Sequence, residues 1–392
     1  MNLSEKEYHW LPSRDSDLTS RLIVVKVGTG SITSRAGELD VDEMRRLAEQ
    51  MAGALKMGHK IVLVTSGAVA AGVAELGLPS NSRDIVYQQA FAATGQSVLM
   101  AKYRELFNLH GVKIAQVLLT AEDLSNRASY LHTRNVLKLL LKIGVIPIIN
   151  ENDVTSVDEL VPVTEGFRIN FSDNDILSAL VANAIRADTL IILSDVDGLY
   201  TSNPKNPGAE MIKEVHDITK ELKGSLSGKS KYGKGGIQSK INAAEIATKS
   251  GIPVVIANSR RENVILDVLS GKEVGTRFDP KGRISAVKSW IAYGASVKGK
   301  IFVNAGAKKA IREGSSLLPV GVMKVVGNFK LGEIVSIVDE EGVEFAKGNP
   351  NYDSGSINMI KGLQMSMVKK KLGDSRPREV VGRKKMHLTR EG

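Results

Sequence analysis

Lysines stand beside glycine turns at two places in this sequence, and this pattern suits the binding of phosphate groups. At residues 24–30, VVKVGTG carries Lys26 from a run of β-branched residues into a glycine turn. At residues 231–240, KYGKGGIQSK sets three glycines among lysines, just before a helical pattern. Glycine lets backbone N–H groups approach an anion closely, and lysine adds positive charge. Either segment alone is a weak signal, but the polar motifs that follow other predicted strands strengthen the prediction of a phosphate site.

Small polar and acidic side chains follow other apolar segments. TSGAVAAG with Ser66 occupies residues 65–72, NEND residues 150–153, SDND residues 172–175 and SDVDGLY residues 194–200. Ser66 and the first residues of SDND also fit helix N-caps, and SDVDGLY also fits a turn. A helix N-terminus with a free hydroxyl suits an anionic ligand too. NEND has more polar side chains than a turn requires, so it is a candidate site.

Two glycine-rich segments resemble nucleotide-binding fingerprints without matching them. GSLSGKS at residues 224–230 is one residue short of a P-loop, and no apolar strand leads into it. GTGSIT at residues 28–33 lacks the third glycine of the dinucleotide-binding pattern. The sequence has no cysteine, which excludes disulfides, thiolate metal sites and thiol nucleophiles. No pair of histidines has metal-site spacing, so the protein ligands of any metal stay unassigned.

Strand and helix patterns alternate along the first part of the chain. Apolar strand patterns occupy residues 22–27, 60–65, 113–118, 145–149, 190–193 and 253–257. Helical patterns lie between them at residues 42–57, 85–109, 131–143, 174–187 and 237–250. This alternation predicts an α/β fold with an open, mainly parallel sheet sandwiched by helices. In such folds ligands gather at the carboxyl ends of the strands, where the motifs above fall.

The sequence pattern changes after residue 275. The short segments ISAVKSW, GKIFVNAG, GVMKVV and EIVSIVD alternate with glycine turns, which predicts a compact β domain with one short helix at residues 307–313. The predicted organisation is therefore a polar extension at 1–20, an α/β domain at 21–275, a linker at 276–296, a β domain at 297–380 and a basic tail at 381–392. The last 32 residues hold ten Lys and Arg against three acids. A solvated basic face is the more common explanation, and binding to nucleic acid is the alternative.

Length and composition limit the class of protein. A chain of 392 residues predicts two domains, each able to bury its own core. No apolar run has membrane-spanning length, and the first twenty residues are too polar for a signal peptide. The absence of cysteine is compatible with a reducing compartment, so we expect a cytoplasmic protein without a membrane segment.

Taken in order along the chain, the motifs resemble the amino acid kinase family. The resemblance rests on VVKVGTG, VTSGAVAAG, VIPIINEND, SDNDILSAL, LSDVDGLY and GKGGIQSK. GSSLLPVGV at 314–322 and VVGNFKLGE at 325–333 resemble the PUA domain, a small β-barrel-like domain. The pairing of these two domains implies phosphorylation of the side-chain carboxylate of L-glutamate by Mg-ATP. The product would be an acyl phosphate, made in the first step of proline biosynthesis.

The resemblance also implies residue roles. Lys26 and Lys240 match the family's two phosphate-binding catalytic lysines, and Asp175 matches the carboxylate that orients them. The positions that hold the amino acid substrate match Ser66, Asp153 and Asn174. The nucleotide side matches Lys26, Ser194, Asp195, Lys234, Gly235, Gly236, Ile237, Gln238, Ser239 and Lys240. A carboxylate is already a nucleophile at neutral pH, so no general base is required.

The sequence departs from the family pattern in the second glycine loop. Lys234, Ile237 and Ser239 replace the usual threonine, methionine and second threonine, and Gly30 stands where serine is common. Two alternatives stay open: a sibling kinase for uridylate, aspartate or acetylglutamate, and an RNA-binding or regulatory protein that uses the PUA-like domain. The resemblance further implies ATP and Mg²⁺ as cofactors, feedback inhibition by L-proline, and a homo-oligomer, either dimer or tetramer.

Overall fold

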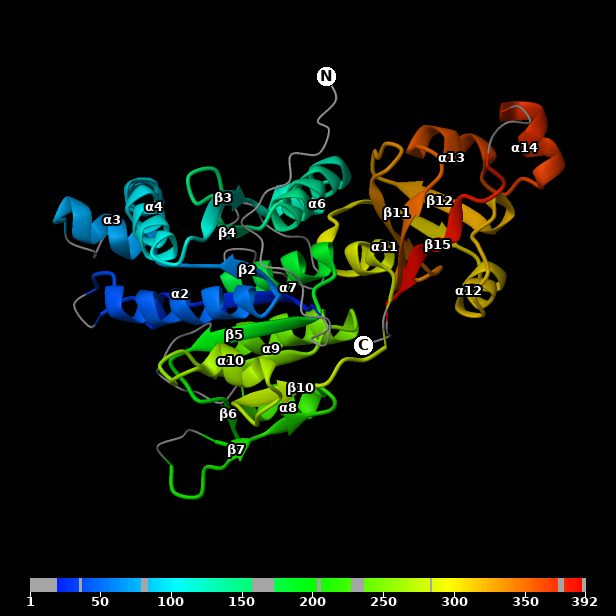
Figure 1. The fold of residues 1–392 in the computed structure, drawn as a ribbon. Helices are drawn as coiled ribbons and strands as arrows, with labels where there is room; N and C mark the ends of the chain where they lie inside the picture. Colours follow the sequence, from blue (N-terminus) through cyan, green and yellow to red (C-terminus); the bar gives the residue numbers. More distant parts are fainter. Residues whose placement is uncertain are drawn as a thin grey trace. The chain divides into compact units, whose positions relative to one another are not determined.

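The computed structural model describes residues 20–34, 37–78, 84–156, 173–202, 206–226, 236–282, 284–372 and 377–389. The chain forms two compact units (Figure 1). The first consists of residues 1–121 and 134–283, and the second of residues 122–133 and 284–392. The predicted positions 234 and 235 lie outside the described residues.

An eight-stranded, mainly parallel sheet forms the centre of the first unit, and its order is β3-β4-β2-β1-β5-β9-β10-β8. Its strands are β1 (Leu22–Val27), β2 (Lys60–Val64), β3 (Lys113–Leu119), β4 (Val145–Glu151), β5 (Thr189–Ser194), β8 (Glu214–Val215), β9 (Val254–Asn258) and β10 (Thr276–Phe278). Only the β9–β10 pair is antiparallel among the described pairs of this sheet. A separate hairpin joins β6 (Leu199–Tyr200) to β7 (Met211–Ile212).

Strand β1 lies inside the sheet, with β2, β4 and β3 on one side of it and β5, β9, β10 and β8 on the other. It pairs with β2 on one side and with β5 on the other, both in parallel. The strand order therefore reverses at β1, and such a switch point leaves a crevice at the carboxyl ends of the strands. The run LIVVKV suits this place, since a strand covered on both faces needs nearly continuous apolar residues.

Helices cover both faces of the sheet. Buried residues of α2 (Val41–Lys56), α4 (Ile85–Asn108) and α10 (Val264–Leu269) form one core with Ile23, Val25 and Val27 of β1. Helix α7 (Asn174–Ile185) contacts β1, β2, β4 and β5, and α9 (Gly236–Lys249) packs on α7 and β9. Because side chains alternate along a strand, Val24 and Lys26 face the opposite side from Val25, which is the side of α7.

Two glycines let α3 (Ala68–Leu76) and α4 cross at very short range, and Figure 1 shows these helices side by side. A Cβ added to Gly72 would stand 1.8 Å from the carbonyl oxygen of Phe91. A Cβ added to Gly95 would stand 1.9 Å from the carbonyl oxygen of Ala68. The backbones themselves are thus in contact, and no larger residue fits at either position.

The remaining helices of the first unit are short. They are α1 (Thr29–Ile32), which follows β1 directly, and α8 (Lys220–Leu226). Helix α6 (Arg127–Lys142) begins in the second unit and ends in the first. No helix among the described ranges is both long and apolar enough to span a membrane.

The second unit contains a five-stranded sheet in the order β12-β11-β13-β14-β15. The strands are β11 (Val297–Val303), β12 (Val322–Val326), β13 (Ile334–Val338), β14 (Glu344–Pro350) and β15 (Val381–Leu388). The helices are α5 (Ala121–Ser125), whose residues from Glu122 belong to this unit, α11 (Ala286–Ser289), the π-helix η1 (Trp290–Gly294), α12 (Ala305–Arg312), the 3₁₀ turn η2 (Pro319–Gly321), α13 (Ser354–Ile360) and α14 (Met365–Leu372). An apolar core that includes Ile301, Val335 and Phe345 holds them together.

Residues 122–133 belong to the second unit because they pack on Trp290. Its indole Nε1 donates a buried hydrogen bond of 2.8 Å to the carbonyl of Leu124. The ring of Tyr130 lies 5.7 Å from that of Trp290, centroid to centroid. A segment far away in the sequence thus becomes part of this unit.

The predicted fold class is confirmed, whereas several details differ. ISAVKSW was predicted as a strand but is largely helical, in α11 and the start of η1. Residues 276–278, predicted as linker, are strand β10, and residues 381–388, predicted as tail, are strand β15 paired with β14. Two further helices, α13 and α14, accompany α12 in the β domain.

Candidate active site

A cavity of about 410 Å³ opens at the carboxyl ends of the central strands. Residues that follow β1, β2, β4 and β5 line it, together with residues at the starts of α1, α3, α7 and α9. This volume falls within the usual range for small-molecule sites. The cavity therefore occupies the crevice that the reversal of strand order creates at β1.

Lys26, Asp175 and Lys240 meet at this cavity. Lys26 points toward α7 because of the strand alternation described above, and Asp175 lies in the first turn of that helix. The Lys26 ammonium forms an ion pair with Oδ1 of Asp175. The Lys240 ammonium, from α9, lies 3.0 Å from Oδ2 of the same carboxylate. One carboxylate therefore fixes two lysines from two different elements.

The carboxylate and one of its two lysines are almost completely buried. Asp175 is 1% exposed and Lys26 is 4% exposed. A buried charge is costly unless it is paired, so the carboxylate holds both ammonium groups close to it. The three groups together carry one excess positive charge at the cavity wall, which favours an anionic ligand such as a phosphoryl group.

A chain of amide and hydroxyl groups also lines the cavity. Nδ2 of Asn174 donates to Oγ of Ser66 at 2.9 Å and to Oδ1 of Asn150 at 3.0 Å. Ser66 does not cap α3, since the N-cap is Gly67 and no side chain makes a capping bond there. Gly67 has φ of +97°, which favours glycine, and this turn directs the chain out of Ser66 into the helix. Ser66 is thus left to face the cavity.

Carboxylates line the same cavity near the end of β4. Glu151 is buried, and its Oε1 accepts a hydrogen bond of 2.6 Å from Oγ of Ser156. Asp153 lies in the turn that follows, and burial raises the pKa of its carboxyl group, although its own backbone N–H partly opposes the shift. A desolvated carboxylate is suited to receive a positively charged ligand group. Asp173 instead caps α7, accepting from the backbone N–H of Asp175 at 2.9 Å.

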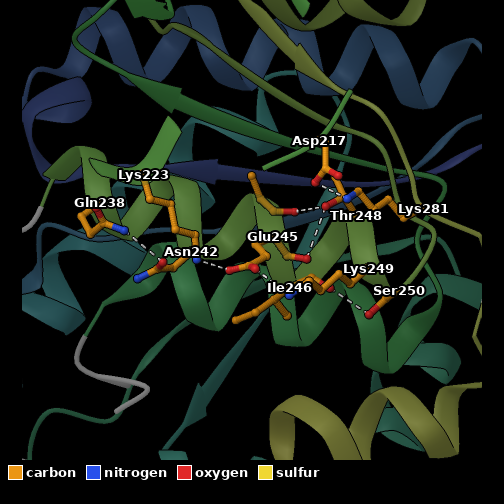
Figure 2. Close-up of polar contacts among 11 residues, drawn as sticks. Asp217, Lys223, Gln238, Asn242, Glu245, Ile246, Thr248, Lys249, Ser250 and Lys281 are labelled. Carbon is orange, nitrogen blue, oxygen red and sulfur yellow. Dashed lines mark hydrogen bonds and ion pairs between the residues drawn. The ribbon is translucent and has the colours of Figure 1, made fainter. Parts of the chain in front are cut away.

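The predicted nucleotide residues are only partly brought together. Ser194 and Asp195 line the cavity beyond β5, joined by a 3.1 Å hydrogen bond from Oγ of Ser194 to Oδ1 of Asp195. Gly236 lines it at the start of α9. Ile237, Gln238 and Ser239 are not among its lining residues, and Nε2 of Gln238 donates to Oδ1 of Asn242 (Figure 2).

The outer side of α9 carries a second shared carboxylate, seen in Figure 2. Glu245 forms ion pairs with Lys223 of α8 and with Lys249, the latter at 2.5 Å. Burial raises the pKa of Glu245, and hydrogen bonds from the two lysines outweigh it, so the net pKa is lowered. This pairing attaches α9 to α8 and so supports the helix that carries Lys240.

Several cavity residues were not singled out from the sequence. Thr29 and Ser31 line the cavity from α1, and Asn150 and Glu151 line it from β4. NEND was recognised as over-rich in polar groups, which was the available signal for the last two. The glycine turn after Lys26 was the signal for the first two.

Comparisons with known proteins agree with this geometry. The amino acid kinase family matches residues 21–258, and the PUA domain matches residues 299–372. The chain belongs to the amino acid kinase family. Relatives that match nearly its whole length are glutamate 5-kinases. One from Thermoanaerobacter sp. (strain X514) is 42% identical over 374 residues, covering 94% of this chain and 98% of its own.

Two further glutamate 5-kinases show similar agreement. That of Moorella thermoacetica (strain ATCC 39073 / JCM 9320) is 44% identical over 368 residues, covering 93% of this chain and 95% of its own. That of Gloeobacter violaceus (strain ATCC 29082 / PCC 7421) is 42% identical over 357 residues, covering 90% of this chain and 94% of its own. The similarity therefore includes both units.

Proposed function

We propose that this protein transfers the γ-phosphoryl group of ATP to the side-chain carboxylate of L-glutamate, giving L-glutamyl 5-phosphate for proline biosynthesis. The observation that carries the proposal is the pair of lysines held by Asp175 in a cavity that amide, hydroxyl and carboxylate groups also line. The same cavity thus offers cations for phosphate and polar groups for an amino acid. The full-length relatives named glutamate 5-kinase support the choice of substrate.

The reaction requires no covalent participation of the protein. The side-chain carboxylate of glutamate attacks the γ-phosphorus, and ADP leaves, so the nucleophile needs no deprotonation at neutral pH. Lys26 and Lys240 neutralise charge on the transferring phosphoryl oxygens, and Asp175 keeps both ammonium groups in place. Ser66, Asp153 and Asn174 hold the amino acid so that its carboxylate is aligned with the phosphorus.

The described residues fit ATP better than they fit a protein-held metal. Two lysines and the N-terminus of α9 face the cavity, which suits a polyphosphate. Ser194 and Asp195 line the same cavity, and we assign them with residues 234–240 to the nucleotide. No group of three or more acidic or histidine side chains among the described residues could hold a metal ion. We therefore propose that Mg²⁺ arrives with ATP, whose phosphate oxygens supply most of its ligands.

Trapping of the acyl phosphate by hydroxylamine tests this function. The purified chain, incubated with Mg-ATP, hydroxylamine and L-glutamate, should form a hydroxamate. Parallel reactions with aspartate, N-acetylglutamate and uridylate distinguish the sibling activities, and uridylate cannot give a hydroxamate. Hydroxamate with aspartate or N-acetylglutamate but not with glutamate would assign the protein to another substrate.

Asp153 provides a pH-dependent prediction. Its raised pKa means that it gains a proton at a higher pH than the ordinary aspartate value of about 3.9, and then it no longer attracts an ammonium group. We expect kcat/KM for glutamate to fall on the acid side as Asp153 is protonated, since kcat/KM reports groups of the free enzyme. Asp153→Asn should remove the contribution of Asp153 to this limb and raise KM for glutamate, leaving KM for ATP within a few-fold.

Steady-state kinetics of both proteins across the acid range measure this effect. The side-chain carboxyl of glutamate titrates in both and serves as the internal reference. An equal rise of KM for ATP, or an unchanged acid limb, would contradict the assignment of Asp153 to the substrate ammonium.

Other properties follow from membership of the family alone. We propose feedback inhibition by L-proline, a homo-oligomeric state and a cytoplasmic location. Binding of RNA by the second unit stays a prediction from the sequence. Each is testable separately, by inhibition assays, light scattering and fractionation, without bearing on the phosphoryl transfer.

A further inference from the structure

A buried glutamine of α4 is hydrogen-bonded to the network of amide and hydroxyl groups that lines the cavity. Gln96 is 9% exposed and is not among the residues that line the cavity. Its Oε1 accepts a hydrogen bond of 2.8 Å from Nδ2 of Asn150. Its own Nε2 finds no hydrogen-bond partner within the described part of the chain. The side chain thus acts here as an acceptor only.

This single contact determines the direction of every bond that follows it. With Nδ2 of Asn150 engaged by Gln96, Oδ1 of Asn150 must turn to its other neighbour, Asn174. Both N–H groups of Asn174 are then used, one by Asn150 and one by Ser66. Oδ1 of Asn174 is left without a partner among the described residues, although it is buried.

The two residues of this network farthest from Gln96 therefore present groups of opposite kind. Oδ1 of Asn174 can only accept a hydrogen bond. The hydroxyl of Ser66 already accepts from Asn174, so its proton is available to be donated. Both residues line the cavity.

We propose that Gln96 is a positioning residue that orients Asn150 and Asn174, so that the site offers an acceptor to the substrate ammonium and a hydroxyl donor to its α-carboxylate. This inference rests on the proposed function. Gln96 does not touch the substrate and acts only through the side chains between them.

The surroundings support recognition of a free ammonium group. Glu151 and Asp153 line the same cavity, so Oδ1 of Asn174 adds a third acceptor. A primary ammonium has three N–H donors and a positive charge to satisfy these groups. The nitrogen of an N-acylated amino acid has one N–H and is uncharged. Orientation of Asn174 by Gln96 thus favours unmodified amino acids over N-acylated ones.

Three variants test the proposal. Gln96→Met removes the acceptor with little change in volume and frees the Asn150 amide to turn, so KM for glutamate should rise about tenfold, the worth of a hydrogen bond to a charged group. Gln96→Glu keeps an acceptor at the same place and removes the unpartnered Nε2, so KM should stay within about threefold of the wild-type value. In both variants KM for ATP should change by less than about twofold, because the lysines are untouched.

Gln50→Met is the matched control. Gln50 is likewise buried, and its Oε1 accepts a 2.9 Å hydrogen bond from the backbone N–H of Ile265, between α2 and α10. Its replacement removes one buried acceptor without affecting the cavity. We expect a lower Tm with an unchanged KM for glutamate.

The outcomes are distinct. If Gln96→Met keeps the wild-type KM for glutamate, Gln96 does not position the site. If Gln96→Glu is as impaired as Gln96→Met, an acceptor at this place does not suffice to orient the amides and the proposal is wrong. Failure of the proposed function would instead appear in the wild-type protein, as an absence of hydroxamate with glutamate.

Discussion

Lys240→Ala is expected to lower kcat with glutamate by about 10²-fold or more, because it removes one of two cations from the transferring phosphoryl group. Lys26→Ala should have an effect of the same size for the same reason. Asp175 keeps one lysine partner in either variant, so the buried carboxylate does not become an isolated charge. Turnover should therefore fall much further than the Tm.

Lys249→Ala is the control for this prediction, and the chain offers a close match. Lys249 lies on the same helix as Lys240 and is likewise one of two lysines that share a carboxylate, here Glu245. Glu245 retains Lys223 when Lys249 is removed. We expect a similar change in Tm and turnover within about threefold of wild type, since a partly exposed ion pair contributes little. Equal turnover in the Lys240 and Lys249 variants would exclude Lys240 from the reaction.

Gly72→Ala should strongly destabilise the first unit. The new methyl group would overlap the carbonyl of Phe91, and backbone cannot move aside as a side chain does. Overpacking of this kind costs about 3 kcal/mol, which corresponds to a Tm lower by about 6–12 °C for a unit of this size. Because α3 begins beside Ser66, KM for glutamate should rise as well. Thermal unfolding and kinetics measure both effects.

Gly53→Ala, in the last turn of α2, is its control. A Cβ there would lie 3.7 Å from the nearest atom, a side-chain carbon of Leu266, which is ordinary contact. Alanine in a helix interior is more stable than glycine by about 0.5–1 kcal/mol. The Tm should therefore stay the same or increase. A Gly72→Ala protein as stable as wild type would show that α3 and α4 can separate without cost.

The sequence predicted the elements that follow a clear period. Strand β1 was expected at its observed bounds, because a run of six residues rich in valine and isoleucine leads into a glycine turn. Strand alternation and the start of α7 also explain why Lys26 and Asp175 meet. Segments without such a period were less predictable. ISAVKSW was predicted as a strand because it is one of several short segments that alternate with glycine turns. In the structure Trp290 is held by Leu124 and Tyr130, contacts that no local pattern reveals.

For the site, too, local patterns were predictable from the sequence and long-range contacts were not. Residues next to glycine turns or in polar clusters after strands were recognised, because those patterns are local. Gln96 was not, since it lies within an ordinary helical pattern and its role depends on Asn150, 54 positions away. The position of residues 381–388 in the sheet likewise depends on pairing with β14, which their basic composition does not indicate.

The packing of residues 122–133 on Trp290 has a consequence for synthesis of the chain on the ribosome. The two halves of that contact are 166 positions apart, and the whole second part of the first unit is made between them. At 5–20 residues per second the delay is roughly 10–30 seconds. Leu124 and Tyr130 must wait through this interval without their indole partner, in a segment that already continues into α6. A chimaera that exchanges only residues 284–392 between relatives would place a foreign Trp290 surface on a native segment, so the graft has to include residues 122–133.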